Sequence, residues 1–506
     1  MSDKLTETKS DAQIPKEERL DLRSFRAALW VMIFQFTQQF FQIVLGIVMI
    51  RILSPSEYGI WGMLAIYCAI FVLFSESGFT EAIVQKKEIT DIDLSTIFYF
   101  NLFLCTVMAV IVYFSAEPAA YFFREPRLVL MIKIFAPLLL IAPMGAIQTA
   151  VLARDLRQGT ATLSGLAACC LALPAALIIA WKGGGCWALF IQFFLTFLLR
   201  NCFLVLQVRW YPRLQFSRSS LKQVLSFGMN FLLSNIMVVI SENINNIVIG
   251  RAFPARQLGF FDRSKALGSL WPISIFRVLA SIVFSSFSKI QEDRVRLESA
   301  FFRVLTFSAF VLVFPSMLVC TLSRPLIELV FTSKWLPLVP GLWLFSIIYI
   351  IVSLSGIHHN LLLACGRGKT YAKLVIFERS MLILNAFLMI RCGIIPLIAG
   401  TGIIFFTGLC FCVYLVKREI DFSLFKLIRT IFPYLFYTFI SCSVSWLMYR
   451  AIYPVHPWCG FLLSVFTGCV FYILLNRIFK SAAYCDLIRL LGDLLKRPNP
   501  PEQFRS

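Results

Sequence analysis

Long apolar runs alternate with short polar turns along most of the chain's 506 residues. A transmembrane helix needs about 20 mostly apolar residues, because each residue advances the helix axis by about 1.5 Å. About fourteen stretches meet this requirement, and two of them, 259–286 and 371–390, also contain charged residues. The pattern therefore predicts an all-α, polytopic membrane protein. Its predicted spans are 28–50, 59–77, 94–115, 128–151, 162–181, 185–206, 225–249, 259–286, 298–321, 337–362, 371–390, 393–416, 428–449 and 457–479.

The first and seventh predicted spans end in similar sequences, 200 residues apart. Residues 47–51 read IVMIR and residues 247–251 read IVIGR, and a proline follows each in a short turn, Pro55 and Pro254. Similarity at a fixed offset indicates an internal repeat. Six spans separate the two copies, so both halves enter the membrane in the same orientation. This arrangement is a parallel repeat, with its axis along the membrane normal.

Polar side chains recur at matching positions of these two spans. The first span carries four glutamines at i, i+3, i+4 and i+7, which share one face of a helix. Gln35 and Gln42 correspond to Asn235 and Glu242 under the 200-residue offset. Because transporters built from two repeats bind substrate between them near the midplane, we expect these stripes to line a central cavity.

The repeat predicts a division of the chain into two bundles and three accessory segments. The bundles are 28–206 and 225–416, each with six helices. A basic linker, 207–224, joins them, and two additional transmembrane helices follow at 428–480. The predicted cytoplasmic tails are 1–27 and the amphipathic segment 481–506.

Composition supports a membrane location. Hydrophobic residues make up 59% of the chain and charged residues 15%, whereas soluble domains are about 45–50% apolar and about 25% charged. The net charge of +20 lies mostly in short loops, and the loops on the side of the termini carry more Lys and Arg than the opposite loops. This bias predicts that both termini are cytoplasmic in a multi-pass protein. No basic segment forms a separate soluble domain, so we expect no nucleic-acid partner.

The sequence contains no recognisable catalytic or metal-binding constellation. The fifteen cysteines lie mostly inside apolar runs without metal-ligand spacing, and no phosphate-binding loop of the Walker type is present. Every loop is short, so no segment forms a catalytic domain. We expect neither enzyme activity nor a metal or other cofactor.

Charged residues inside predicted spans are candidate functional residues, because each costs several kcal/mol to insert. Glu242 lies deep in span 225–249, and Glu378 lies beside Arg379 in span 371–390. Glu242 is open to two interpretations, a functional group in the cavity or one member of a structural hydrogen-bond network. Arg51 and Arg251 end their spans, where they contact either lipid headgroups or an anionic part of a substrate.

Several loop sequences together resemble those of bacterial polysaccharide flippases of the Wzx type, and most closely the colanic-acid-exporter-like branch. The similarity covers roughly residues 25–480. The segments that carry it are 51–59 (RILSPSEYG), 78–88 (GFTEAIVQKKE), 123–127 (FREPR), 185–189 (GCWAL), 209–221 (RWYPRLQFSRSSL) with 227–228 (FG), and 284–291 (FSSFSKIQ).

This resemblance implies two six-helix bundles plus two trailing helices, the fold of the multidrug/oligosaccharidyl-lipid/polysaccharide exporter superfamily. It also implies transfer of an undecaprenyl-pyrophosphate-linked oligosaccharide across the bacterial inner membrane by alternating access. A chain polymerase and glycosyltransferases are the implied partners. Many family members have Asp where this chain has Asn245, so that position is not expected to bind a proton or ion here.

On this hypothesis the polar residues inside the spans divide into three roles. Basic residues would bind the pyrophosphate, amide side chains would bind sugar hydroxyls, and two carboxylates are candidates for coupling or proton binding. The candidates for binding the pyrophosphate are Arg51, Arg251, Arg263 and Arg277. The candidates for binding sugar hydroxyls are Gln38, Gln42, Asn243 and Asn246. The candidates for coupling or proton binding are Glu242 and Glu378.

Two other functions remain open from the sequence. A drug or cation antiporter of the same superfamily would need an acidic cavity, for which Glu242 is the main candidate. A membrane glycosyltransferase or ligase would need an acidic or arginine-rich cluster on a loop, and the short loops contain none.

Overall fold

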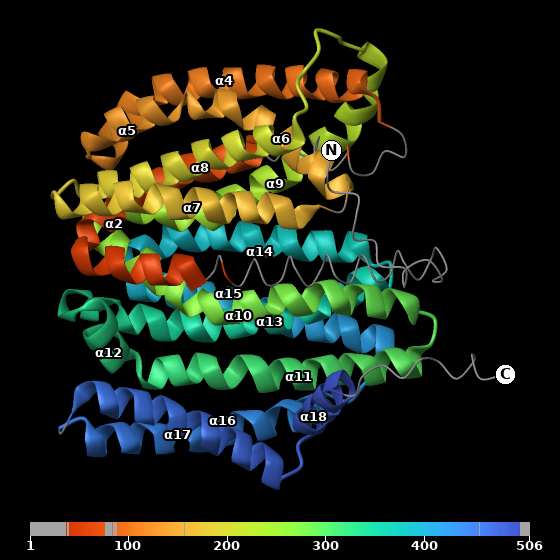
Figure 1. Ribbon diagram of the computed structural model, residues 1–506. Helices are drawn as coiled ribbons and strands as arrows, with labels where there is room; N and C mark the ends of the chain where they lie inside the picture. Colours follow the sequence, from red (N-terminus) through yellow and green to blue (C-terminus); the bar gives the residue numbers. More distant parts are fainter. Residues whose placement is uncertain are drawn as a thin grey trace, which may run out of the picture. The chain divides into compact units, whose positions relative to one another are not determined.

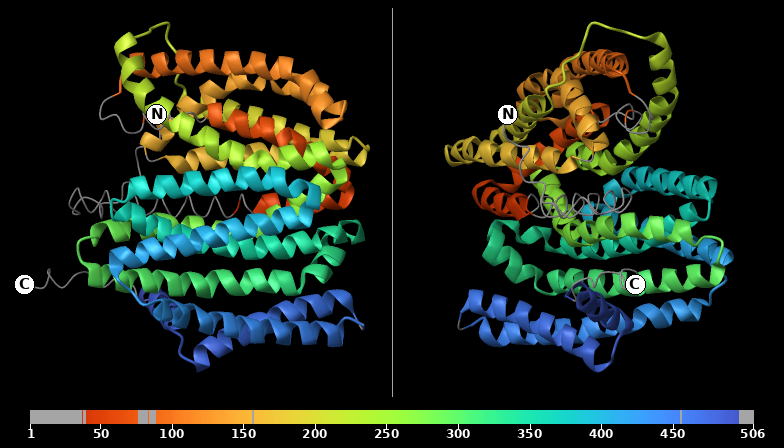
Figure 2. Two further views of the ribbon diagram at one scale, coloured as in Figure 1. Left: turned by 180° about the vertical axis from the view of Figure 1, so that it is seen from behind. Right: turned by 45° about the vertical axis from the view of Figure 1, so that its right-hand side comes forward.

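The computed structural model describes residues 37, 40–75, 83, 89–155, 157–454 and 456–495, and these residues form helices joined by short turns, without a β-strand (Figures 1 and 2). The predicted tail 1–27, residues 28–36, 38 and 39 of span 28–50, the segment 78–88 apart from Ile83, and residues 496–506 lie outside the described residues. The predicted all-α fold is confirmed.

The chain divides into two compact units, Met1–Asn243 and Ile244–Ser506, and the division falls within helix α9. The first unit contains the helix Phe40–Ile52, α2 (Pro55–Ser75), α4 (Asp91–Phe123), α5 (Arg127–Phe135), α6 (Leu138–Arg154), α7 (Gln158–Trp181), α8 (Cys186–Val208) and most of α9 (Arg218–Ala252). The second contains α10 (Ala255–Lys289), α11 (Arg294–Thr321), α12 (Ser323–Leu326), the short turns η2 (Ile327–Phe331) and η3 (Ser333–Leu338), α13 (Val339–Ala364), α14 (Gly368–Met389), η4 (Ile390–Cys392), α15 (Ile394–Ile420), α16 (Leu424–Ile452), α17 (Pro457–Ile478) and α18 (Ala482–Leu495).

Each predicted span coincides with a helix or a bent helix pair over the residues described. Among the described residues, eight helices are individually long and apolar enough to cross a membrane, and there are nine if α5 and α6, which are bent by 42° relative to each other, count as one span. Large apolar side chains point outward from them, including Phe439, which is 71% exposed, and Phe466, which is 65% exposed. A surface of this kind suits contact with lipid tails, so the protein is a multi-pass membrane protein.

The repeat in the sequence is also a repeat in local geometry. The helix Phe40–Ile52 ends at Ile52, and α2 begins at Pro55. In the same way, 200 residues later, α9 ends at Ala252 and α10 begins at Ala255. The turn hydrogen bonds correspond as well, because Leu53 N–H donates to the Met49 carbonyl at 2.8 Å and Phe253 N–H donates to the Ile249 carbonyl at 2.9 Å. The predicted correspondence of the two turns is confirmed.

Helix packing inside the two units follows one plan. In the first unit α2 packs on α4 and α6, α6 packs on α4, α7 and α8, and α7 packs on α8. In the second unit α10 packs on α11 and α13, α13 packs on α11, α14 and α15, and α14 packs on α15. These pairs correspond between the two units, although α2 also packs on α8 in the first unit and α11 also packs on α15 in the second.

The two additional helices, α16 and α17, pack on each other and on α11 (Figure 1). The Tyr472 ring stacks on Phe314 with centroids 4.2 Å apart, and its hydroxyl donates to the Phe310 carbonyl at 2.9 Å. Between α16 and α17, Ser445 Oγ donates to the Ser464 carbonyl at 2.8 Å. Small residues allow this close approach, as is typical of membrane helix pairs.

Helix α18 forms most of the predicted amphipathic tail and is attached to the second unit by an ion pair. The Arg303 guanidinium on α11 donates two hydrogen bonds to the Asp486 carboxylate, at 2.8 and 2.9 Å. The Ala483 N–H also donates to Tyr434 Oη at 3.3 Å. These contacts hold the start of α18 against α11 and α16.

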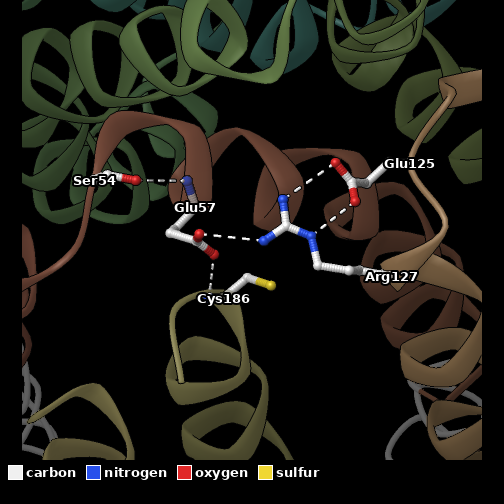
Figure 3. Close-up of polar contacts among 5 residues, drawn as sticks. All are labelled: Ser54, Glu57, Glu125, Arg127 and Cys186. Atoms are coloured by element: carbon white, nitrogen blue, oxygen red, sulfur yellow. Dashed lines mark hydrogen bonds and ion pairs between the residues drawn. The ribbon is translucent and has the colours of Figure 1, made fainter. Parts of the chain in front are cut away.

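One end of the first unit is tied together by a cluster centred on Glu57 (Figure 3). The Glu57 carboxylate accepts a hydrogen bond from the Cys186 N–H at 2.5 Å and lies 3.2 Å from Arg127 Nη1. Arg127 also donates from Nε to Glu125 at 2.8 Å. The cluster joins the N-terminal ends of α2, α5 and α8, and thus brings together three of the loop sequences that carry the family resemblance.

We expect Glu57→Ala to lower the free energy of unfolding by about 1–3 kcal/mol, because it leaves the Cys186 N–H and Arg127 without their carboxylate partner. Thermal unfolding of the purified protein in detergent measures the effect. Glu117→Ala is the matched control, since Glu117 pairs with Lys133 at 2.8 Å but its side chain is 73% exposed. Equal unfolding temperatures for the two variants would contradict a stabilising role for the cluster.

Candidate functional site

The polar stripe predicted on the seventh span lies on the second half of α9. Asn246 is buried, and its Nδ2 donates to Asp262 Oδ1 on α10 at 3.0 Å. Asn243 is partly buried, and its Nδ2 donates to the Val239 carbonyl at 2.9 Å. Glu242 is exposed on the same helix. The stripe therefore combines amides that already have partners with a carboxylate at the helix surface.

The corresponding stripe of the first span is described only in part. Gln38 lies outside the described residues, and Gln42 is exposed on the helix Phe40–Ile52. Arg51 is exposed near the end of that helix, and Arg251 is exposed near the end of α9. Each arginine therefore lies one residue before the last of its helix, immediately before the repeated turn.

The other two candidate arginines lie on α10. Arg263 is partly buried next to Asp262, and Arg277 is exposed. The two are 14 residues apart, which corresponds to about four turns and about 21 Å along the helix axis. At that spacing they lie on nearly the same face of α10. An extended anionic or hydroxyl-rich ligand could contact both.

Glu378 is buried within the second unit, with 5% of its surface exposed. Its carboxylate lies against Gly408 of α15, where a Cβ atom would overlap it. It accepts no hydrogen bond from any residue that the structure describes, and the neighbouring Arg379 acts on it electrostatically. A carboxylate buried in such surroundings is costly unless a cation neutralises its charge.

Other ionisable side chains gather near Glu378, between α13, α14 and α15. Ser355 Oγ lies 3.5 Å from His359 Nε2 and 3.9 Å from Cys412 Sγ. The His359 and Tyr371 rings meet edge to face with centroids 5.1 Å apart. Arg379 also acts electrostatically on His359 and Tyr371. Within the described residues no group of three His, Cys, Asp or Glu side chains could hold a metal ion.

Two polar residues of this region were not among the candidates from the sequence. One of them is Asp262 on α10, which accepts the hydrogen bond from Asn246. Asn246 lies six residues before the end of α9, and Asp262 lies seven residues after the start of α10. Because the two helices run antiparallel, the two residues lie at the same height along the pair. Asn385 lies seven residues after Glu378, on the same face of α14, and donates to the Leu397 carbonyl at 3.1 Å.

The chain matches the family described as "Polysaccharide biosynthesis protein" over residues 48–340. It is 28% identical to an uncharacterized membrane protein in the cps region of Klebsiella pneumoniae, over 65% of this chain and 68% of that protein. It is 23% identical to the lipopolysaccharide biosynthesis protein WzxC of Escherichia coli strain K12, over 66% of this chain and 69% of WzxC. It is also 26% identical to the teichuronic acid biosynthesis protein TuaB of Bacillus subtilis strain 168, over 58% of this chain and 61% of TuaB.

Solved structures share the fold. The lipid II flippase MurJ in an inward closed conformation superposes with a TM-score of 0.74 and 15% identity, covering 91% of this chain and all of MurJ (100%). A multidrug resistance transporter of the MATE family, inward-facing, superposes with a TM-score of 0.58 and 14% identity, covering 76% of this chain and 96% of the transporter. The arrangement of helices is thus that of polytopic transporters.

The matched residues 48–340 run from the first repeated turn, through the Glu57 cluster and the α9–α10 pair, to the start of α13. They cover more than half of the chain and contain most of the candidate residues described above. The chain belongs to the polysaccharide biosynthesis protein family.

Proposed function

We propose that this protein moves undecaprenyl-pyrophosphate-linked oligosaccharide units from the inner to the outer leaflet of the bacterial inner membrane, for assembly of a surface polysaccharide. The observation that supports this most strongly is the family match over residues 48–340. The names of the relatives point the same way, since WzxC acts in lipopolysaccharide biosynthesis and TuaB in teichuronic acid biosynthesis.

The fold supports transport rather than catalysis. A flippase for lipid II, named as such, has the same arrangement of helices over 91% of this chain. The internal repeat suits alternating access, in which two bundles rock around a fixed site. We assign the moving bundles to 28–206 and 225–416, joined by 207–224, with both termini cytoplasmic. A chain polymerase and glycosyltransferases would act after and before this step.

The candidate residues suit an amphiphilic, anionic cargo. Arg51, Arg251, Arg263 and Arg277 would bind the pyrophosphate, because guanidinium groups donate paired hydrogen bonds to phosphate oxygens. Sugar hydroxyls would contact Gln38, Gln42, Asn243 and Asn246. The polyprenyl tail would stay in the bilayer. Glu242 and Glu378 are the groups that would couple transport to an ion gradient.

Deletion of the gene tests the proposed cargo directly. We expect surface polysaccharide to disappear and its lipid-linked precursor to accumulate in the inner leaflet, because the sugar headgroup cannot cross apolar lipid unaided. Mass spectrometry of lipid extracts and leaflet-specific labelling measure both quantities. Normal surface polysaccharide without trapped precursor would refute the function, and loss of dye efflux instead would favour an antiporter.

We expect Arg251→Gln and Arg277→Gln each to reduce precursor flipping in proteoliposomes about tenfold or more, because a charge-assisted hydrogen bond contributes about 1.5–3 kcal/mol. Both arginines are exposed, so the variants should insert normally. Arg391→Gln is the matched control, since Arg391 is an exposed arginine in η4, directly after α14. Equal losses in all three variants would remove Arg251 and Arg277 from the proposed binding site.

We expect Glu378→Gln to abolish the response of transport to an imposed pH gradient while leaving cargo binding intact. Glutamine keeps the volume of the side chain beside Gly408 but cannot gain or lose a proton. Transport assays in proteoliposomes with and without the gradient, together with a binding assay, separate the two effects. Glu292→Gln, at an exposed loop position, is the control. A variant that still responds to the gradient like the unaltered protein would exclude Glu378 as the coupling group.

A further inference from the structure

The segment 209–217, which links α8 to α9, is held in a defined position on the first unit. The Arg213 N–H donates to Ser95 Oγ at 3.1 Å, and the Ser217 N–H donates to Thr96 Oγ1 at 3.0 Å. Both acceptors belong to the first turns of α4 and are buried. Two backbone hydrogen bonds to a transmembrane helix thus anchor the middle and the end of the segment.

Side-chain contacts anchor both ends of the same segment. The Trp210 carbonyl accepts a hydrogen bond from Gln148 Nε2 at 2.8 Å, and the Trp210 ring packs edge to face on Phe98 with centroids 6.3 Å apart. At the other end, Ser220 Oγ donates to Asp93 Oδ1 at 2.5 Å. The segment 209–217 is therefore a fixed part of the first unit, although it has no regular secondary structure.

Large apolar side chains of this fixed segment point away from the protein. Leu214 is 94% exposed, Tyr211 is 59% exposed and Phe216 is 55% exposed. None of the anchoring contacts described above involves these three side chains. Exposed apolar groups gathered on a short, rigid segment indicate a surface that something else covers.

Basic residues surround these apolar side chains. Arg209, Arg218 and Lys222 are exposed, and Arg213 is exposed while pairing with Asp91 at 3.2 Å. The segment directly follows helix α8, which is long and apolar enough to span a membrane, and it leads into α9. A segment at the end of such a helix is expected near the level of the lipid headgroups. Aromatic and basic side chains together favour that level, because rings suit the headgroup boundary and cations suit anionic headgroups.

We propose that residues 209–222 form a docking surface for anionic phospholipid headgroups of the inner leaflet. Tyr211, Leu214 and Phe216 enter the boundary between headgroups and acyl chains, and Arg209, Arg218 and Lys222 bind phosphate groups. The anchoring hydrogen bonds fix the backbone beforehand, so little order is lost when lipid binds. The surface would hold the inner end of the first unit at a constant depth, whatever cargo the protein carries.

Hydrogen exchange of the full-length protein in lipid nanodiscs tests this surface. We expect the peptide covering 209–217 to exchange several-fold more slowly in nanodiscs that contain phosphatidylglycerol than in nanodiscs of phosphatidylcholine alone. The triple variant Arg209→Gln, Arg218→Gln, Lys222→Gln should lose this difference. It leaves Arg213, Trp210 and Ser217 intact, so the linker keeps its anchors. A matched triple variant at exposed basic residues elsewhere, Arg294→Gln, Lys369→Gln, Lys373→Gln, should keep the difference.

Two results would overturn the proposal. One is equal exchange of the 209–217 peptide in the two kinds of nanodisc. The other comes from a photo-crosslinking residue, p-benzoylphenylalanine, placed at Leu214 in cells. Crosslinks to phospholipid are expected, whereas crosslinks only to another protein would assign the surface to a protein partner.

Discussion

The bilayer interior offers no water to hydrogen-bond the backbone, and every part of this structure depends on that constraint. The described chain meets it with helices that satisfy their own backbone groups. Polar side chains inside the bundles then find partners on the same or the adjacent helix, as Asn246 does with Asp262 and Ser445 does with the Ser464 carbonyl. Apolar side chains are left to face lipid. Buried polar groups without such a partner, such as the Glu378 carboxylate, are therefore the most informative about function.

The two units share a plan of helix packing but differ in how they use charge. The first unit places its main ionic cluster at one end, where Glu57 and Arg127 join three helix starts. The position equivalent to Glu57 in the second unit is Gln257, so the cluster has no exact counterpart there. The second unit instead buries Glu378 beside Gly408, among side chains that can exchange protons. Both units bury a carboxylate, but Asp93 of the first unit accepts hydrogen bonds from Thr90 and Ser220, whereas Glu378 accepts none from the residues that the structure describes.

The polar residues inside the helices suit the proposed transport of a lipid-linked oligosaccharide. Such a cargo is anionic and hydroxyl-rich at one end and apolar at the other, so it needs guanidinium groups, amides and access to lipid. Arg263 and Arg277 lie on nearly one face of α10 and are separated by about 21 Å along the helix axis, a spacing that suits the extended headgroup of the proposed cargo. The fixed linker 209–217 would add a stable reference at the membrane surface.

The sequence by itself determined the helical fold, the position of most spans and the repeat, because bilayer thickness translates directly into runs of apolar residues. It also singled out Glu378, since a charge in such a run is visible without a structure. Only the tertiary structure decided which polar residues meet. Asn246 and Asp262 are level only because α9 and α10 are antiparallel. Glu57, Arg127 and Cys186 lie at the starts of three different helices. Contacts between distant segments depend on helix packing, which the pattern of apolar residues along one chain does not specify.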